Sequence, residues 1–202
     1  MHEIRLRAAP LLIAAAVCAT LGACARMPGT ASVPPAVTAN AAATSLPQPV
    51  APGIRADGQP DADRLRAYAR AGVRTVINLR TADEPVDYDE AAVAASLGLE
   101  LVHLPIRGAG DLDDEHVAAF GRALDAARAK GDVLVHCASG NRVGALVALD
   151  AVRNRAVDAD AALELGRQAG LTGLEEPVRE RVREIAARTE RRKAACAEGA
   201  HC

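Results

Sequence analysis

The chain has almost no aromatic residues, and its charges nearly balance. Its 202 residues include two tyrosines, one phenylalanine and no tryptophan, and 24 basic residues stand against 26 acidic ones. Proteins that bind nucleic acids use aromatic platforms that stack bases, or basic patches that contact phosphates. Because the sequence offers neither feature, we expect no nucleic-acid partner. The core must be built from Ala, Val, Leu and Ile.

The N-terminal apolar run is too short and too rich in alanine for a membrane-spanning helix, which needs about 20 predominantly apolar residues. Arg5 and Arg7 precede this run. A basic start followed by a short apolar stretch is typical of a bacterial secretory signal. We therefore predict a signal peptide over residues 1–23.

The end of the apolar run, Leu21-Gly22-Ala23-Cys24, resembles the lipobox of bacterial lipoproteins. The resemblance implies cleavage before Cys24 and lipidation of that cysteine. Because Ala25 rather than an aspartate follows, it also implies the outer membrane, with the chain facing the periplasm. Several acyl chains anchor a protein stably, where one does not. Cleavage after Ala25 and an uncleaved anchor remain alternatives.

Two further cysteines, Cys196 and Cys202, lie near the C-terminus. In an oxidising periplasm they can close a small disulfide loop. Sequence alone does not establish pairing, so two free cysteines, or adventitious metal binding together with His201, remain open.

Composition divides the rest of the chain. Residues 25–52 contain six prolines and little charge, which is typical of an extended tether. We expect the tether over 24–52, one folded domain over 53–190 and a tail over 191–202.

Apolar runs and helical patterns alternate along the predicted domain. Strands are predicted over 73–79, 99–106 and 132–136. Asp61 and Asp113 have the position of helix N-caps, and Gly72 that of a helix stop. Helices are predicted after Asp61 and Asp113 and over 88–98, 142–152, 158–168 and 174–190. The alternation predicts an α/β fold with a largely parallel central sheet flanked by helices on both faces.

The third strand ends in the segment VLVHCASGNRVG, residues 133–144. Ligands of such sheets bind outside the carboxyl ends of the strands, where Cys137 lies. The backbone amides of the small residues 138–141 can converge on one anion, and the following helix directs its positive end there. Both effects stabilise a thiolate.

The conjunction of these residues favours a nucleophile at Cys137 over a small buried apolar residue. Arg142 presents a planar fork suited to two phosphate oxygens. His136 is expected behind the loop, bonding loop carbonyls and fixing the cradle. Ser139 is expected to donate to the leaving group or to cap the helix. The predicted phosphate-binding residues are Ala138, Ser139, Gly140, Asn141 and Arg142.

The segment VLVHCASGNRVGALVAL resembles the active-site segment of the cysteine-dependent protein tyrosine and dual-specificity phosphatase superfamily. With GQPDADRLRAYARAGVRTVINLR and LGLELVHLPI, it is more similar to the bacterial phosphatase-like proteins named for the beta-lactamase hydrolase-like domain. The resemblance covers residues 53–180. It implies a thiol-phosphate intermediate at a phosphate monoester, with no metal and no cofactor.

One departure concerns the length of the loop. The phosphatase signature is H-C-x5-R, whereas four residues separate Cys137 from Arg142 here. A six-residue loop beginning with cysteine resembles the rhodanese sulfurtransferases, in which the cysteine carries a persulfide. A phosphatase of this type also needs a general acid, and Asp111, which follows two glycines in an upstream loop, is the candidate.

Three functions therefore compete. The first is a cysteine-dependent phosphatase of a small phosphorylated substrate, and the second is a sulfurtransferase that uses a sulfur donor. The third is a non-catalytic module that binds phosphate or another anion. The membrane would be a partner through the N-terminal lipid, and the sequence names neither the substrate nor an oligomeric state.

Overall fold

The computed structural model describes residues 45–197, which belong to one of the chain's two compact units, Asn40–Cys202. The signal peptide predicted over 1–23, the lipidation site Cys24, most of the tether and Cys202 lie outside the described residues. These features stay predictions. Within 45–197, no helix combines the length and the apolarity that crossing a membrane requires.

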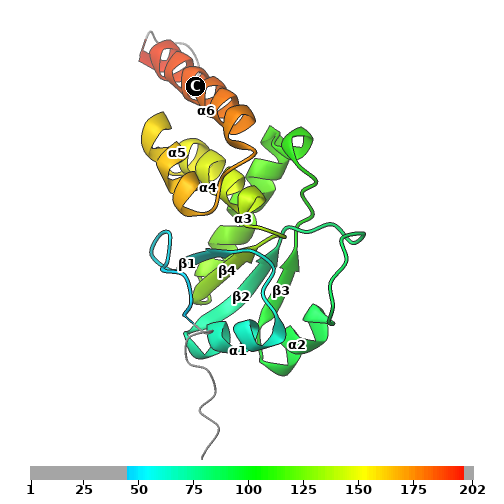
Figure 1. Ribbon diagram of the computed structural model, residues 1–202. Helices are drawn as coiled ribbons and strands as arrows, with labels where there is room; N and C mark the ends of the chain where they lie inside the picture. The colour runs from blue at the N-terminus through cyan, green and yellow to red at the C-terminus, as the bar shows by residue number, and fades with distance from the viewer. Residues whose placement is uncertain (1–44, 198–202) are drawn as a thin grey trace, which may run out of the picture. The chain divides into compact units, whose positions relative to one another are not determined.

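Four parallel strands form the central sheet, in the order β1-β4-β2-β3 (Figure 1). They are β1 (Ile54–Asp57), β2 (Val73–Asn78), β3 (Glu100–His103) and β4 (Asp132–His136). The sequence did not reveal β1, because its four residues, IRAD, contain one branched apolar side chain. The α/β architecture predicted from the alternating pattern is confirmed.

The strand predicted over 99–106 ends at His103. Pro105 has no amide hydrogen to contribute to a sheet. The chain still follows β2 for three more residues, because the amides of Leu104 and Ile106 donate to the carbonyls of Asn78 (2.9 Å) and Leu79 (3.0 Å). This extension carries the loop after β3 to the carboxyl end of the sheet.

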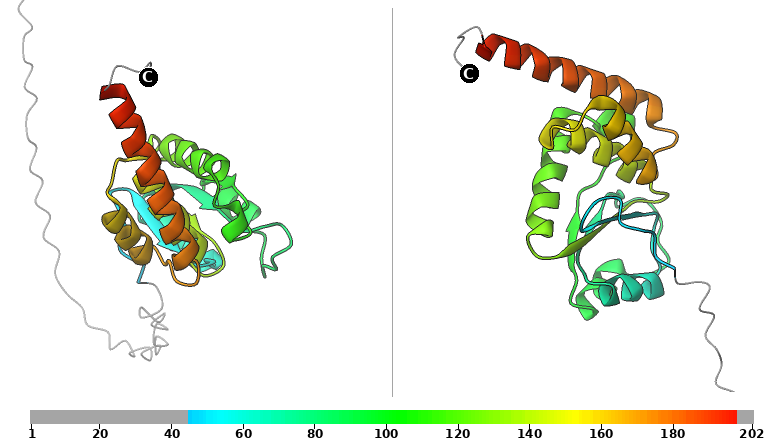
Figure 2. Two further views of the ribbon diagram at one scale, coloured as in Figure 1. Left: turned by 90° about the horizontal axis from the view of Figure 1, so that it is seen from above. Right: turned by 90° about the vertical axis from the view of Figure 1, so that its left-hand side faces the viewer.

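The helices cover the two faces of the sheet unequally (Figures 1 and 2). One face holds α1 (Ala62–Arg70) and α2 (Glu90–Ser96). The other holds α3 (Asp114–Arg128), α4 (Asn141–Asn154), α5 (Ala159–Gln168) and α6 (Glu175–Ala197). The predicted N-caps Asp61 and Asp113 accept the amides of Arg64 and His116, and the left-handed Gly72 follows α1. The short polar side chains of Asp61 and Asp113 satisfy amides that a helix leaves unpaired.

Successive residues of the central strands β2 and β4 divide between two apolar layers. Val76 and Leu134, which are neighbours in register, pack under α1 and α2. Ile77 and Val135, the next pair, pack in the larger layer under α3 to α6. Both layers exclude water from β4, which explains why its sequence is almost wholly apolar. The site at its end therefore rests on a rigid support.

Helix α6 extends beyond the end predicted at residue 190 and reaches Ala197. Its buried residues, Val178, Val182 and Ile185, all lie in its first half. The second half is mostly exposed, and its end projects past the other helices in both views of Figure 2. The apolar pattern that predicts a helix stops where burial stops, so it missed the last turns.

Candidate active site

Cys137 lies at the carboxyl end of the central strand β4 and immediately before the loop that leads into α4. Residues Asn78 of β2 and His136 of β4 are paired in register, so the loops after both strands open at the same edge of the sheet. Cys137 is fully buried and free. Its position is the one at which open parallel sheets bind ligands.

The backbone of the loop wraps around the sulfur of Cys137. The amide of Gly140 donates to Sγ over 3.1 Å, and Gly140 has a φ of 88°, which favours glycine. Among residues 45–197, no backbone or side-chain acceptor takes the amides of Ala138, Ser139, Asn141, Arg142 or Val143. Unpaired amides at a helix N-terminus bind anions. The predicted cradle is thus present, and helix α4 has no side-chain cap from Ser139.

The loop is held in place from both sides. The carbonyl of Ala138 accepts the amide of Gln59, over 3.1 Å, from the segment after β1. The side chain of Asn141 accepts the amides of Thr172 (2.9 Å) and Leu174 (3.3 Å), which follow α5. The side-chain oxygen of Asn141 therefore fixes the loop, and its backbone amide and side-chain NH2 group remain as donors for an anion.

The guanidinium of Arg142 is held end-on by the carboxylate of Glu84. Nη1 donates to Oε1 over 2.6 Å and Nη2 donates to Oε2 over 2.7 Å. Nη1 also donates to the carbonyl of Ile106 over 2.8 Å. The two side chains are 11% and 23% exposed. The guanidinium also has a hydrogen bond with the side chain of Cys137, so Arg142 lies beside the cysteine at which a phosphate oxygen would have to be held.

The pairing between Arg142 and Glu84 changes the pKa of both groups. Hydrogen bonds from Arg142, with smaller contributions from those of Thr81, lower the pKa of Glu84 to about 2 against the opposing effect of burial. The hydrogen bond to Glu84 raises the pKa of Arg142 against the opposing effect of burial, and the neighbouring Cys137 raises it further. Both groups are therefore charged throughout the neutral range.

His136 faces a carboxylate and not the loop carbonyls that the sequence led us to expect. Its Nε2 lies 2.8 Å from Oε1 of Glu90, and Oε2 of Glu90 accepts the side-chain amide of Asn78 over 2.6 Å. His136 is fully buried, and neither ring nitrogen makes an aligned hydrogen bond within the described part. The sheet alternation explains the difference, because it turns the imidazole toward α2 and away from the loop.

A cavity of about 470 Å³ opens beside Arg142. Its lining residues are Thr81, Asp83, Glu84, Arg107, Gly108, Ser139, Asn141, Arg142 and Leu174. Asp111 does not line it. The carboxylate of Asp111 accepts the amide of Arg107 over 2.8 Å within a short 3₁₀ turn, η2 (Ala109–Asp111). Residues 137–142 thus lie together at the end of β4. Asp111 lies in the neighbouring 3₁₀ turn, outside the cavity.

Glu84 and Asp83, the two acidic residues that line the cavity, were not predicted from the sequence. Both lie in the long loop between β2 and α2, at the edge of the sheet where Cys137 lies. The hydrogen bond from the Thr81 side chain lowers the pKa of Asp83. Their position in the sequence could have indicated them. An acidic pair follows a predicted strand that would lie beside the strand ending at Cys137.

The remaining predicted groups lie apart from this cavity. Cys196 is disulfide-bonded, and its predicted partner, Cys202, lies outside the described residues. No group of three or more His, Cys, Asp or Glu side chains within 45–197 is arranged to hold a metal ion.

Comparison with protein families places this site within a matched region. The model of the phosphatase-like domain of beta-lactamase hydrolase-like proteins matches residues 48–156, which include β1 to α4 and the Cys137 loop. Beta-lactamase hydrolase-like proteins from two strains of Xylella fastidiosa are each 37% identical over 117 residues, 56% of this chain. The chain matches only 26% of the length of these relatives.

Solved structures share the fold. A putative phosphatase from Shewanella putrefaciens superposes with a TM-score of 0.57 at 23% identity, over 73% of this chain and 93% of that one. TpbA from P. aeruginosa, crystallised as a cysteine-to-serine variant in complex with pTyr, superposes with a TM-score of 0.55 at 26% identity. That alignment covers 66% of this chain and 80% of TpbA.

Proposed function

Because the chain belongs to the family of phosphatase-like domains of beta-lactamase hydrolase-like proteins, we propose that it is a cysteine-dependent phosphatase of phosphate monoesters. The observation that carries the proposal is the loop itself. A free buried cysteine lies under unpaired backbone amides, and a charged arginine lies beside it. TpbA, a structural relative, has been crystallised with pTyr, which supports a phosphoryl ligand at this kind of site.

In the proposed reaction, the thiolate of Cys137 attacks phosphorus, an S–P bond forms and the P–O bond to the leaving group breaks. The amides of the loop and the guanidinium of Arg142 stabilise the equatorial oxygens, on which the charge of the transition state is spread. Water then attacks the thiol-phosphate, the S–P bond breaks, and phosphate and the thiolate are released. Glu84 holds Arg142 in place and neutralises part of its charge before the substrate arrives.

The leaving oxygen needs a proton, and we propose that Asp111 supplies it. Arg107 and Gly108, in the same loop, already line the cavity. Side chains added at Gly108 and Gly110 would meet nothing within 4 Å, so no neighbour packs against this side of the turn; we propose that the turn moves toward the substrate. Asp83 also lines the cavity, but the hydrogen bond from Thr81 favours its ionised form and lowers its pKa, which makes it a poorer proton donor. In the second step, Asp111 takes the proton of the attacking water.

A sulfurtransferase is the second candidate. The loop has four residues between Cys137 and Arg142, one fewer than the phosphatase signature, and Asp111 lies outside the cavity. A persulfide on Cys137 would need the amides but no general acid. The sulfurtransferase hypothesis predicts that replacement of Asp111 leaves the rate of sulfur transfer unchanged.

The two candidates are separated by assaying the purified, reduced protein on p-nitrophenyl phosphate and, in parallel, on thiosulfate with cyanide. We expect phosphate release that disappears in Cys137→Ser. We also expect Asp111→Asn to slow it by about 100-fold or more, in line with the usual contribution of a general acid. Asp83→Asn, a matched change at a carboxylate in the cavity, should leave it nearly unchanged. Thiocyanate formation without phosphate release would support the sulfurtransferase.

We also propose that Cys24 is lipidated and holds the domain at a membrane facing the periplasm. The support is the sequence pattern around Leu21-Gly22-Ala23-Cys24. Fractionation of cells that express the chain should place it with membranes. Cys24→Ala should move it to the soluble fraction, and equal membrane association of both forms would contradict the proposal.

A further inference from the structure

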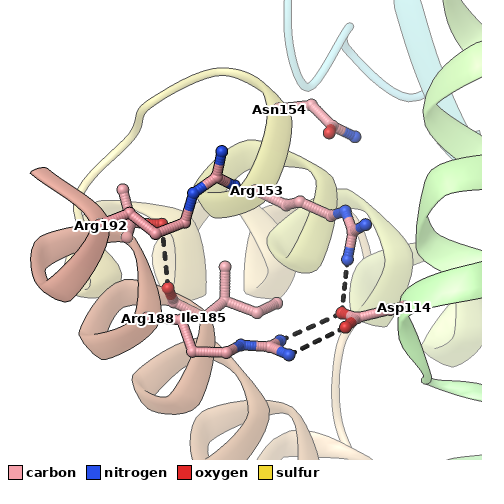
Figure 3. Close-up of a pocket in the computed structure, with 7 residues that line it drawn as sticks. Asp114, Arg153, Asn154, Ile185, Arg188 and Arg192 are labelled. Carbon is pink, nitrogen blue, oxygen red and sulfur yellow. Dashed lines mark hydrogen bonds and ion pairs between the residues drawn. The ribbon is translucent and has the colours of Figure 1, made fainter. Parts of the chain in front are cut away.

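A second cavity, of about 350 Å³, lies among helices α3, α4 and α6, and arginines dominate its lining (Figure 3). Asp114 comes from the start of α3, Arg153 from the end of α4, and Arg188 and Arg192 from α6. None of the residues that line it lines the cavity beside Arg142. It is therefore a separate site by position and by composition.

Three arginines converge on the single carboxylate of Asp114. Arg153 is in contact with Oδ1, Arg181 donates to Oδ1 over 2.7 Å, and Arg188 donates to both oxygens over 2.9 and 3.1 Å. These contacts lower the pKa of Asp114, chiefly through the hydrogen bonds from Arg188. Glu184 neutralises part of the positive charge of the three arginines, since it pairs with Arg181 over 2.7 Å. The cluster keeps more positive charge than its carboxylates balance.

Arg192 adds a further positive charge to this cavity. It lines the cavity, and no acidic side chain within the described part of the chain pairs with it. It follows Arg188 by four residues on α6, and like charges at this spacing destabilise a helix. A local rule broken without a compensating contact is typical of a functional site. Lys193, by contrast, is paired with Glu190.

We propose that this arginine pocket binds a phosphate-type oxyanion. Planar guanidinium groups bind the oxygens of phosphates in pairs. Arg192 and the free edges of Arg153 and Arg188 supply donors that Asp114 does not use. A cavity of about 350 Å³ lies at the lower end of the size range for small-ligand sites, and suits a group larger than one water. Asp114 orders the arginines while the ligand is absent.

The oxyanion has two possible sources, a soluble ion or the phosphate of a phospholipid headgroup. Two arms distinguish them, both on the full-length chain carrying Cys24→Ala, so that no lipid anchor contributes. The first titrates pyrophosphate by calorimetry. The second measures cosedimentation with phosphatidylcholine vesicles that contain or lack phosphatidylglycerol. Binding in the first arm identifies a soluble ligand, and binding only to the anionic vesicles identifies a headgroup.

Arg192→Gln is the decisive variant, because Arg192 is exposed and pairs with no acidic side chain among residues 45–197, so its replacement should not unfold the domain. Arg191→Gln, one residue away and outside the cavity, removes the same charge. We expect Arg192→Gln to weaken binding of whichever probe binds, pyrophosphate or anionic vesicles, at least about tenfold, as loss of one charge-assisted contact does. Arg191→Gln should have little effect.

Binding that is unchanged in Arg192→Gln would belong elsewhere, for example to the Cys137 loop, and would overturn the proposal. Equal weakening by both glutamine variants, or binding of neither probe, would overturn the proposal. Hydrolysis of p-nitrophenyl phosphate by the same variants tests the proposed phosphatase separately, because neither residue lies near Cys137 in the sequence or lines its cavity.

Discussion

Two arginine–carboxylate clusters of this molecule differ in how fully their charges are matched. At the edge of the sheet, two arginines share Glu84: Arg142 is matched to it end-on, with both side chains mostly buried, and Arg80 adds a single contact over 3.4 Å. Among α3, α4 and α6, Asp114 receives three arginines at side-chain exposures of 22–43%. The first arrangement fixes the guanidinium of Arg142 and leaves less excess charge than the second. The second leaves an excess of positive charge in a partly open cavity.

The difference follows from the cost of burying charge. An unmatched buried ion is expensive, so an arginine that must stand under a catalytic loop needs a carboxylate partner. Near the surface, water screens excess charge, and unmatched arginines are tolerated. A matched pair therefore positions a side chain precisely enough for chemistry, whereas an unmatched cluster attracts anions.

The largest effect is expected at the matched pair itself. Arg142→Lys keeps the charge but cannot contact both oxygens of Glu84 or present a planar edge to the substrate. We expect kcat for phosphate release to fall about 100- to 1,000-fold, as on loss of a donor to a transition-state oxyanion. Steady-state kinetics on p-nitrophenyl phosphate measure this. An activity within a factor of three of the parent would mean that the amides alone hold the phosphate.

A large loss of stability is expected where α4 meets the segment after α5. A side chain at Gly144 would clash with the amide of Leu171 and the carbonyl of Gly166. Gly144→Ala should lower the free energy of unfolding by about 1–3 kcal/mol, as measured by urea denaturation. Gly110→Ala is the control, because a Cβ there would meet nothing within 4 Å. Equal effects of both changes would contradict this packing.

A smaller loss of activity is expected when Glu84 is replaced. Glu84→Gln removes the charge that holds Arg142, and we expect kcat to fall about tenfold, since loss of one charge-assisted contact costs about 1.5–3 kcal/mol at most. Asp83→Asn, the adjacent acidic residue, is the matched control. An unchanged kcat in Glu84→Gln would show that the carbonyl of Ile106 alone positions the guanidinium.

The same pair predicts an acid dependence of stability. The folded pKa of Glu84, about 2, lies below its ordinary value of 4.5. Its contribution is therefore fully present above pH 4.5 and is lost as the pH falls toward about 2. Unfolding curves in this window should converge for the parent and Glu84→Gln. A constant difference between them down to pH 2 would contradict the assignment.

The smallest effect is expected at Asp114. Asp114→Asn removes contacts that are partly exposed, so the melting temperature should change only slightly, by the equivalent of about 1 kcal/mol or less. Anion binding at the arginine pocket should tighten, because the competing carboxylate is gone. Calorimetric titration with pyrophosphate shows whether the affinity rises or falls in Asp114→Asn. Weaker binding in Asp114→Asn would mean that the carboxylate mainly orders the arginines.

The sequence predicted the parts of this molecule that depend on local pattern. The buried strand β4, the caps Asp61 and Asp113 and the loop from Cys137 to Arg142 follow from apolar runs and short-range spacing, and the structure has them in place. β1 was missed because four residues carry too little pattern. Glu84 and Glu90 were missed because their partners, Arg142 and His136, are more than 40 residues away in the chain. Long-range charge pairing leaves no periodic signal.

The central claim is that Cys137 becomes covalently phosphorylated. The most direct test is to mix the reduced protein with a ³²P-labelled monoester, quench within milliseconds and map the labelled peptide. We predict label on the peptide that contains Cys137, and no label in Cys137→Ser. An unlabelled protein that nonetheless releases phosphate, label on another residue, or a persulfide as the only adduct of Cys137 would contradict the account.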